Sequence, residues 1–285
     1  MSGNELLMSL EMGLIYGIVG MGIYLTFKSI DFPDLTCDGS FVLGAASSCM
    51  LLKNGYSPWL SLIAAFFAGA LAGAFTGFLH IKLKITNLLS GILVAFMLYS
   101  INLKVMAGSP NLSLLNKVTL FSDVSSLMVL ILVSLGILGA LGYLLTTDFG
   151  LALRSIGQNK RLGLNGGLKV GSLTVLGLML SNAVIGFAGA LFSQHQGFVD
   201  VSQGIGTVIV GLAAVMIGQR LLYSKSPWTD LLACLLGSIV YRLFISFALH
   251  SDVLGLKTQD LNLITGVLVV LVMILPTRGK KNVTA

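Results

Sequence analysis

The sequence predicts an all-α polytopic membrane protein, and three observations point to that fold class. Of the 285 residues, 55% are hydrophobic and only 10% are charged, and the mean hydropathy is +0.95. A soluble domain averages about 25% charged residues, so this chain lacks the polar side chains that cover a water-facing surface. Its apolar runs, such as 60–79 and 125–145, are as long as membrane-crossing helices and do not alternate as membrane strands do.

The same composition excludes two other classes of protein. A disordered chain needs a far lower apolar content than this one has. A secreted disulfide scaffold needs more cysteines in an even number, whereas the chain has Cys37, Cys49 and Cys234. What remains is a single transmembrane domain over residues 1–285.

The apolar runs divide the chain into about nine expected spans. The residues before the first run carry no positive charge, and the run itself is too long for a signal peptide, so we expect it to be retained. The expected spans are 6–27, 35–52, 58–79, 86–103, 125–145, 171–194, 204–222, 228–249 and 261–276.

The basic residues predict the orientation, because short cytoplasmic loops carry an excess of Lys and Arg. If the C-terminus is cytoplasmic, twelve of the 17 basic residues lie in inner connections and four in outer ones. We therefore expect the N-terminus outside and the C-terminus inside. Since the basic residues follow the topology, the pI near 9.3 reflects orientation and lipid contact, not nucleic-acid binding.

Three short matches in the same order indicate an internal repeat. In the first match, Asp34 precedes Gly44-Ala45-Ala46 as Asp200 precedes Gly211-Leu212-Ala213-Ala214. In the second, Ser57-Pro58-Trp59 corresponds to Ser226-Pro227-Trp228. In the third, Asn87–Val94 corresponds to Asn262–Val269. Residues 6–103 and 171–276 are therefore expected to be two copies of four spans, with a fifth span between them. Because five spans separate corresponding elements, the copies must face opposite ways, a plan common in transporters.

Two charged residues are expected inside spans, at similar depth in the outer half of the bilayer. Glu11 lies a little over one turn into the first span, and Arg242 lies about four turns into the eighth. Intramembrane charges are costly and usually paired, so we expect a Glu11–Arg242 ion pair. The alternative is that Arg242 extends outward to the interface while Glu11 faces water.

Several uncharged polar residues also fall inside the expected spans. They either line a translocation path or make structural hydrogen bonds between helices. The candidates are Asn87, Ser90, Asn102, Ser181, Asn182, Asn262 and Thr265.

Glycines at every fourth position, Gly69, Gly73 and Gly77, form a ridge that allows helices to approach closely. We expect this ridge to pack within the chain or between subunits.

The histidines His80, His195 and His250 stand alone, so no metal site is predicted. We expect His195 in a solvated outer loop.

The sequence contains no enzyme motif. It lacks the G-x-x-x-x-G-K-[ST] phosphate loop, the dinucleotide fingerprint and the G-x-S-x-G elbow. We therefore expect that the chain is not an enzyme and binds no cofactor. If a nucleotide drives its function, a separate chain must hydrolyse it.

Residues 146–170 form the longest inner connection, and its first part has the pattern of a short helix. Asp148 suits the helix N-terminus and Gly157 is a natural stop. Phe149, Leu153 and Ile156 share one face. This apolar stripe is expected either to dock a cytoplasmic partner or to lie on the lipid interface.

This segment resembles a known family. Residues 147–159 are similar to the G-x-A-[LM]-R-A-x-G-x-N segment of bacterial ABC-importer permeases for branched-chain amino acids and monosaccharides. Residues 169–191 and 204–218 resemble the next two spans of that family. The opening at 14–46 is also similar. In place of the family's N-F-A-H-G-x-x-x-x-x-G, residues 35–44 carry a variant typical of a subgroup associated with tryptophan and tyrosine.

The resemblance implies an inner-membrane permease that imports a small polar solute, most simply an amino acid. It also implies two permease copies in a dimer, two cytoplasmic ATPases that bind ATP and Mg, and a periplasmic or lipid-anchored solute-binding protein. Gly150, Arg154, Gly157 and Asn159 match the segment that meets the ATPase. Alternatives are a stand-alone secondary transporter, an importer of a sugar or nucleoside, and a channel or membrane scaffold.

Overall fold

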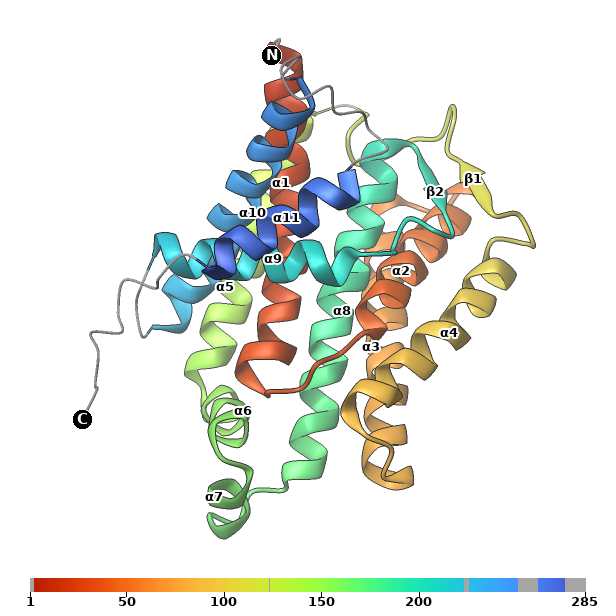
Figure 1. Ribbon diagram of the computed structural model, residues 1–285. Helices are drawn as coiled ribbons and strands as arrows, with labels where there is room; N and C mark the ends of the chain where they lie inside the picture. Colours follow the sequence, from red (N-terminus) through yellow and green to blue (C-terminus); the bar gives the residue numbers. More distant parts are fainter. Residues whose placement is uncertain (1–2, 123, 223–225, 251–260, 275–285) are drawn as a thin grey trace.

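The computed structural model describes residues 3–122, 124–222, 226–250 and 261–274, and nearly all of them are helical (Figure 1). A π-helical segment, η1 (Tyr24–Ser29), continues the first helix. The helices are α1 (Gly3–Ile23), α2 (Thr36–Lys53), α3 (Pro58–Leu83), α4 (Asn87–Val105), α5 (Ser126–Thr146), α6 (Asp148–Gln158), α7 (Lys160–Asn165), α8 (Val170–Gln196), α9 (Thr207–Leu221), α10 (Pro227–His250) and α11 (Leu261–Ile274).

Each expected span coincides with a helix, but the count of nine is not confirmed. In the part of the chain described, six helices are long and apolar enough to cross a membrane: α1 with η1, α3, α4, α5, α8 and α10. Of the others, α2 has 18 residues but is not apolar enough, while α9 with 15 residues and α11 with 14 are shorter. The fold class, an all-α polytopic membrane protein, is as predicted.

Two of the short helices begin inside the bundle. The chain reaches α2 through a non-helical stretch, 30–35, in which Asp34 is fully buried. The Asp34 carboxylate accepts a hydrogen bond of 2.9 Å from the amide of Thr36 at the start of α2. Buried non-helical backbone is tolerated where protein covers it and its polar groups are paired. The second expected span, 35–52, is therefore a helix whose first turn follows a buried non-helical stretch.

The N-terminus of α9 is also paired with a carboxylate. Asp38 of α2 accepts hydrogen bonds from the amides of Gly206 (3.2 Å) and Val208 (2.9 Å). Gly206 precedes the helix with a positive φ of 86° and has no side chain to cap it. The Asp38 carboxylate thus supplies from another helix the cap that α9 lacks.

The glycine ridge of α3 packs against α8 within the chain. A Cβ on Gly69 would meet the Asn182 carbonyl, and one on Gly73 would meet the Leu178 carbonyl. Both glycines are buried. The ridge is therefore a packing surface between α3 and α8 and does not lie between subunits.

Contacts between helices follow the pattern that two copies of one unit produce. In this pattern α1, α2, α3 and α4 correspond to α8, α9, α10 and α11. Accordingly, α1 packs on α10 as α8 packs on α3. The contacts of α2 with α3 and α4 likewise correspond to those of α9 with α10 and α11. Both α3 and α10 begin at the proline of a Ser-Pro-Trp triplet, where proline suits the first turn. The boundaries 6–103 and 171–276 stay predictions.

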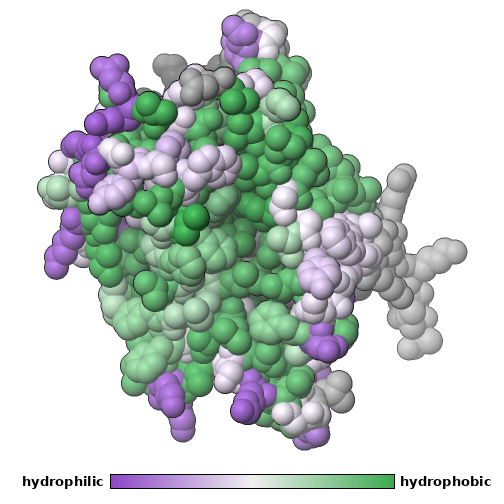
Figure 2. Space-filling view, turned by 180° about the vertical axis from the view of Figure 1, so that it is seen from behind, coloured by the Kyte–Doolittle hydropathy of each residue, from purple (hydrophilic) through white to green (hydrophobic). Residues whose placement is uncertain are grey.

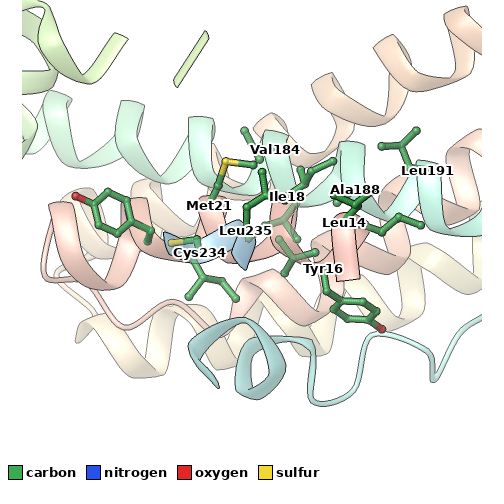
Figure 3. Close-up of a cluster of buried hydrophobic side chains, with 14 of the residues drawn as sticks. Leu14, Tyr16, Ile18, Met21, Val184, Ala188, Leu191, Cys234 and Leu235 are labelled. Carbon is green, nitrogen blue, oxygen red and sulfur yellow. The ribbon is translucent and has the colours of Figure 1, made fainter. Parts of the chain in front are cut away.

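The first helix lies at the centre of the bundle. Figure 3 shows Leu14, Ile18 and Met21 of α1 between Val184 and Ala188 of α8 and Cys234 and Leu235 of α10. Every residue of α1 from Glu11 to Ile23 is buried. Such complete burial explains why this segment is apolar all round and not amphipathic.

Hydrophobic side chains also cover the outside of the molecule. Figure 2 shows them over most of the central part of one face, with hydrophilic residues gathered near its edges. Phe67 of α3, Phe96 of α4 and Tyr143 of α5 are 61%, 76% and 70% exposed. This surface suits lipid chains and not water.

A small antiparallel pair, β1 (Asn111–Ser113) and β2 (Phe198–Asp200), lies at the end of the molecule where α1 begins (Figure 1). Helices α6 and α7 lie at the opposite end. Hydrogen bonds from the hydroxyl and amide of Ser202 hold the pKa of Asp200 below its usual value. The two ends of the bundle therefore carry different structures, a two-stranded sheet and a pair of short helices.

Candidate translocation cavity and coupling segment

A cavity of about 730 Å³ lies among α1, α2, α8, α9, α10 and α11. Its wall combines apolar, aromatic and charged side chains. Asp38 and Arg242 are the two charged residues in the described lining, and Tyr16, Phe192 and Tyr241 are the aromatic ones. A concave, largely apolar site with a few polar groups is the usual form of a small-molecule site.

Arg242 lies against Tyr16 in this wall. The Arg242 guanidinium carbon is 4.1 Å from the centroid of the Tyr16 ring, in cation–π geometry. The buried Nε of Arg242 has no hydrogen-bond partner among the described residues. Arg242 is thus held by a ring face, and its Nε–H donates to no acceptor among the described residues.

The predicted Glu11–Arg242 ion pair is not formed. Instead the Glu11 carboxylate lies 2.8 Å from Nε2 of His195, near the end of α8. His195 is therefore not in a solvated loop, since it belongs to α8 and its ring packs edge-on against Phe121. Counting turns predicts the depth of a residue, but the rotation of α1 decides that Glu11 faces α8 while Tyr16 faces Arg242 of α10.

Aromatic side chains gather beside Arg242. The ring of Tyr16 meets Phe192 edge-on with centroids 5.9 Å apart, and it lies 6.0 Å from Phe41 at a small interplanar angle. These rings come from α1, α8 and α2. The sequence carries no signal for this group, because its members lie on separate helices and share no local pattern.

Most of the predicted polar candidates make structural hydrogen bonds. Asn182 donates to Asp34 (2.7 Å) and accepts from Ser40 (2.7 Å), which ties α8 to α2. Ser90 donates to the carbonyl of Asn87 within the first turn of α4. These residues therefore fit the structural alternative, hydrogen bonds between and within helices, better than the lining of a translocation path.

Three further candidates divide between structural and lining positions. Ser181 donates to the Gly22 carbonyl at 2.7 Å, and Asn102 donates to the Gly39 carbonyl at 3.2 Å. Thr265 lines the cavity and bonds the hydroxyl of Tyr241 at 2.7 Å. The side chain of Asn262 lies outside the described residues.

The other two histidines, His80 and His250, were predicted to stand alone and not to bind a metal. His80 bonds the carbonyl of Ile85 at 2.8 Å, and the side chain of His250 lies outside the described residues. In the described ranges, no three His, Cys, Asp or Glu side chains gather into a possible metal site.

The coupling segment forms two helices, α6 and α7, at one end of the bundle. The expected apolar stripe of α6 is not exposed, because Leu153 and Ile156 are fully buried against Ile30, Phe32 and Leu178. The pattern correctly predicted an amphipathic helix. It could not show that the chain's own bundle, not a partner or lipid, covers the apolar face.

Two glycines of this segment allow α6 to lie close to the bundle. A Cβ on Gly150 would meet the end of α5 at Leu145, and one on Gly157 would meet the Ser29 carbonyl at the end of η1. Asn159 accepts a hydrogen bond from the Arg161 amide and so begins α7. These three predicted coupling residues therefore shape the segment itself.

Arg154 joins a charged cluster at the same end. Asp230 of α10 interacts electrostatically with Arg154 and with Lys28 of η1, and its carboxylate accepts a hydrogen bond of 2.9 Å from Tyr24. The hydrogen bond joins η1 to α10, and Arg154 of α6 adds a positive charge near Asp230. Leu151 and Leu164, 51% and 60% exposed, are left on the outer surface of α6 and α7.

A bundle of apolar helices around such a cavity defines a membrane transport permease. The chain belongs to the family of permease components of branched-chain amino acid transport systems, whose model matches residues 6–275. This family serves ABC importers, and the chain is a multi-pass membrane permease, not itself an enzyme.

Individual relatives carry different substrate names. The chain is 42% identical to a tyrosine transport system permease protein of Clostridioides difficile, over 90% of this chain and 86% of that protein. It is 27% identical to a nucleoside ABC transporter permease protein of Lactococcus lactis, over 74% of this chain and 71% of that protein.

A solved structure shares the fold. The structure titled PsaBC from Streptococcus pneumoniae in complex with Fab matches with a TM-score of 0.54 and 16% identity, over 96% of this chain and 92% of that chain. At this identity the likeness concerns the fold alone.

Proposed function

We propose that this chain is the membrane subunit of an ABC importer for aromatic amino acids such as tyrosine. The observation that carries the proposal is the 42% identity to a tyrosine transport permease over 90% of the chain. The aromatic side chains in the cavity wall, Tyr16, Phe192 and Tyr241, support a substrate with a ring.

The energy comes from a partner in this proposal. Cytoplasmic ATPase subunits, which bind ATP and Mg, dock on the outer surface of α6 and α7. Exposed Leu151 and Leu164 offer apolar contact there, and exposed Lys160 and Arg161 offer charge. In this proposal the docking surface includes α7 as well as α6, because the apolar stripe of α6 is already buried.

A second permease copy and a solute-binding protein complete the proposed importer. The mouth of the cavity carries exposed apolar residues, Met8, Ile205 and Ile209, which a second copy in a homodimer would cover. The periplasmic or lipid-anchored binding protein would dock at the end that carries β1 and β2. The N-terminus then lies outside and the C-terminus inside the inner membrane.

The test is to co-express the chain with candidate ATPase and solute-binding subunits and to measure uptake of labelled solutes into proteoliposomes. We expect a stable complex and ATP-dependent uptake of L-tyrosine or another aromatic amino acid. Leucine, ribose and uridine are the competing solutes. ATP-dependent uptake of ribose or uridine in place of aromatic amino acids would contradict the substrate, and uptake without ATP would contradict the energy source.

A further inference from the structure

We propose that Arg242 is a substrate-binding residue, and that it holds the carboxylate of an amino acid in the cavity while the Tyr16–Phe192 wall receives the side chain. This inference rests on the proposed function and deepens it. It starts from a cationic group in a cavity wall that no carboxylate of the described chain neutralises.

Arg242 has the geometry of a carboxylate receptor. Its guanidinium face is covered by the ring of Tyr16 at 4.1 Å, which leaves the planar edge for hydrogen bonds. Its Nε is buried without a hydrogen-bond partner in the described structure. The guanidinium edge binds a carboxylate through two parallel N–H···O bonds, and it does so most strongly away from water.

The other group that could attract an anion in this cavity is already in use. Gly206 and Val208, at the N-terminus of α9, line the cavity, and a helix N-terminus favours negative charge. However, both amides donate to the Asp38 carboxylate. Arg242 is therefore the remaining partner for a substrate carboxylate.

The charge pattern of the cavity fits a zwitterion. Asp38 and Arg242 are the two charged side chains in its described lining, and they have opposite signs. Each oxygen of Asp38 accepts one bond from α9, but a carboxylate has about four acceptor positions. Asp38 therefore retains capacity for an ammonium group, while Arg242 takes the carboxylate.

The apolar part of the wall accounts for the side chain of the substrate. Tyr16 and Phe192 meet edge-on with ring centroids 5.9 Å apart, and Met8 and Met12 line the same cavity. Aromatic rings prefer such edge-on or offset partners. Methionine side chains adapt to different shapes. A solute without a ring or a comparable apolar group would leave this wall unused.

The first test uses wild-type protein, so it does not depend on the folding of a variant. The complex with its ATPase, without solute-binding protein, is placed in nanodiscs, and binding of labelled L-tyrosine is challenged with analogues. We expect tyramine, which lacks the carboxylate, to compete at least about tenfold more weakly than L-tyrosine, because a charge-assisted bond is lost. Equal competition by tyramine would overturn the proposal.

The second test changes the receptor. Arg242→Gln should weaken L-tyrosine binding about 10- to 100-fold and abolish the preference over tyramine, while Arg242→Lys should lie between. Lys104→Gln, which removes a charge from the exposed end of α4, is the matched control. Unchanged binding and preference in a folded Arg242→Gln complex would contradict the assignment.

The results of these binding tests distinguish a failure of the Arg242 site from a failure of the proposed aromatic substrate. Binding of a non-aromatic amino acid that requires its carboxylate and Arg242 would sustain the site and contradict the aromatic substrate. If the wild-type complex binds none of the amino acids tested, the site is wrong, even if the complex still transports another solute.

Discussion

Charged side chains inside the bundle are each held by a particular partner. Glu11 is held by His195, Asp34 by Asn182 and Thr36, and Arg242 by the ring of Tyr16. An ionisable group away from water is costly unless it is paired. Apart from the local Asp34–Thr36 bond, each contact joins different elements, so the contacts also determine how the helices are rotated.

The Glu11–His195 contact predicts which exchange of residues is tolerated. Glu11→Ala should lower the free energy of unfolding by about 1–3 kcal/mol, because a buried polar partner is lost. The exchange Glu11→His with His195→Glu should recover most of that loss. Thermal unfolding of purified protein measures both. Rescue by an exchange of Glu11 with Arg242 would instead contradict the observed pairing.

Arg154 is predicted to act through Asp230 as well as at the docking surface. Arg154→Glu places two negative charges near each other, so we expect normal membrane insertion but ATP hydrolysis uncoupled from uptake. Pairing it with Asp230→Arg should restore part of the coupling. The ratio of solute imported to ATP hydrolysed in proteoliposomes measures this, and wild-type coupling in Arg154→Glu would refute the role.

Among the elements, the π-helical segment η1 lies at the end of the bundle that carries α6. It continues α1, whose other end lines the cavity through Met8, Met12 and Tyr16. Gly157 of α6 lies against its last residue, Ser29. π-Helical turns are rare and occur often at functional sites. The α1–η1 segment therefore lines the cavity at one end and contacts α6 at the other.

The α3–α8 contact predicts opposite effects for two Gly→Ala substitutions. Gly73→Ala should destabilise the protein by about 1–3 kcal/mol, because the new Cβ would overlap the Leu178 carbonyl. Gly136→Ala on α5 meets open space, so the helix propensity of alanine should make it neutral or stabilising by up to about 1 kcal/mol. Thermal unfolding of both variants in the same detergent tests this, and equal stability would contradict the packing.

For the whole molecule, the two ends of the bundle predict opposite sides of the membrane. Asn54→Cys, after α2, should react with a membrane-impermeant maleimide in intact cells. Asn165→Cys, at the end of α7, should react only after the membrane is opened. The native Cys37, Cys49 and Cys234 are buried, so background labelling should be low. The reverse pattern would reverse the orientation.

Much of the secondary structure follows from local patterns. The Ser-Pro-Trp triplets mark the starts of α3 and α10, and the pattern around Asp148 and Gly157 predicts α6 nearly to the residue. Helices α2 and α9 lie where spans were expected, but hydropathy does not show that each begins within the bundle beside a buried carboxylate. Of the predicted cavity candidates with described side chains, Thr265 lies in the wall, and Arg242, predicted as an ion-pair partner, lies there too.

The sequence by itself determined the membrane fold class, the positions of the apolar helices and the resemblance to importer permeases, since these depend on residues that are neighbours along the chain. Only the tertiary structure decided that Glu11 meets His195, that Arg242 stacks on Tyr16 and that the apolar face of α6 is covered. Those contacts join residues up to 226 positions apart. They depend on the rotation and depth of each helix, which packing of the whole bundle sets.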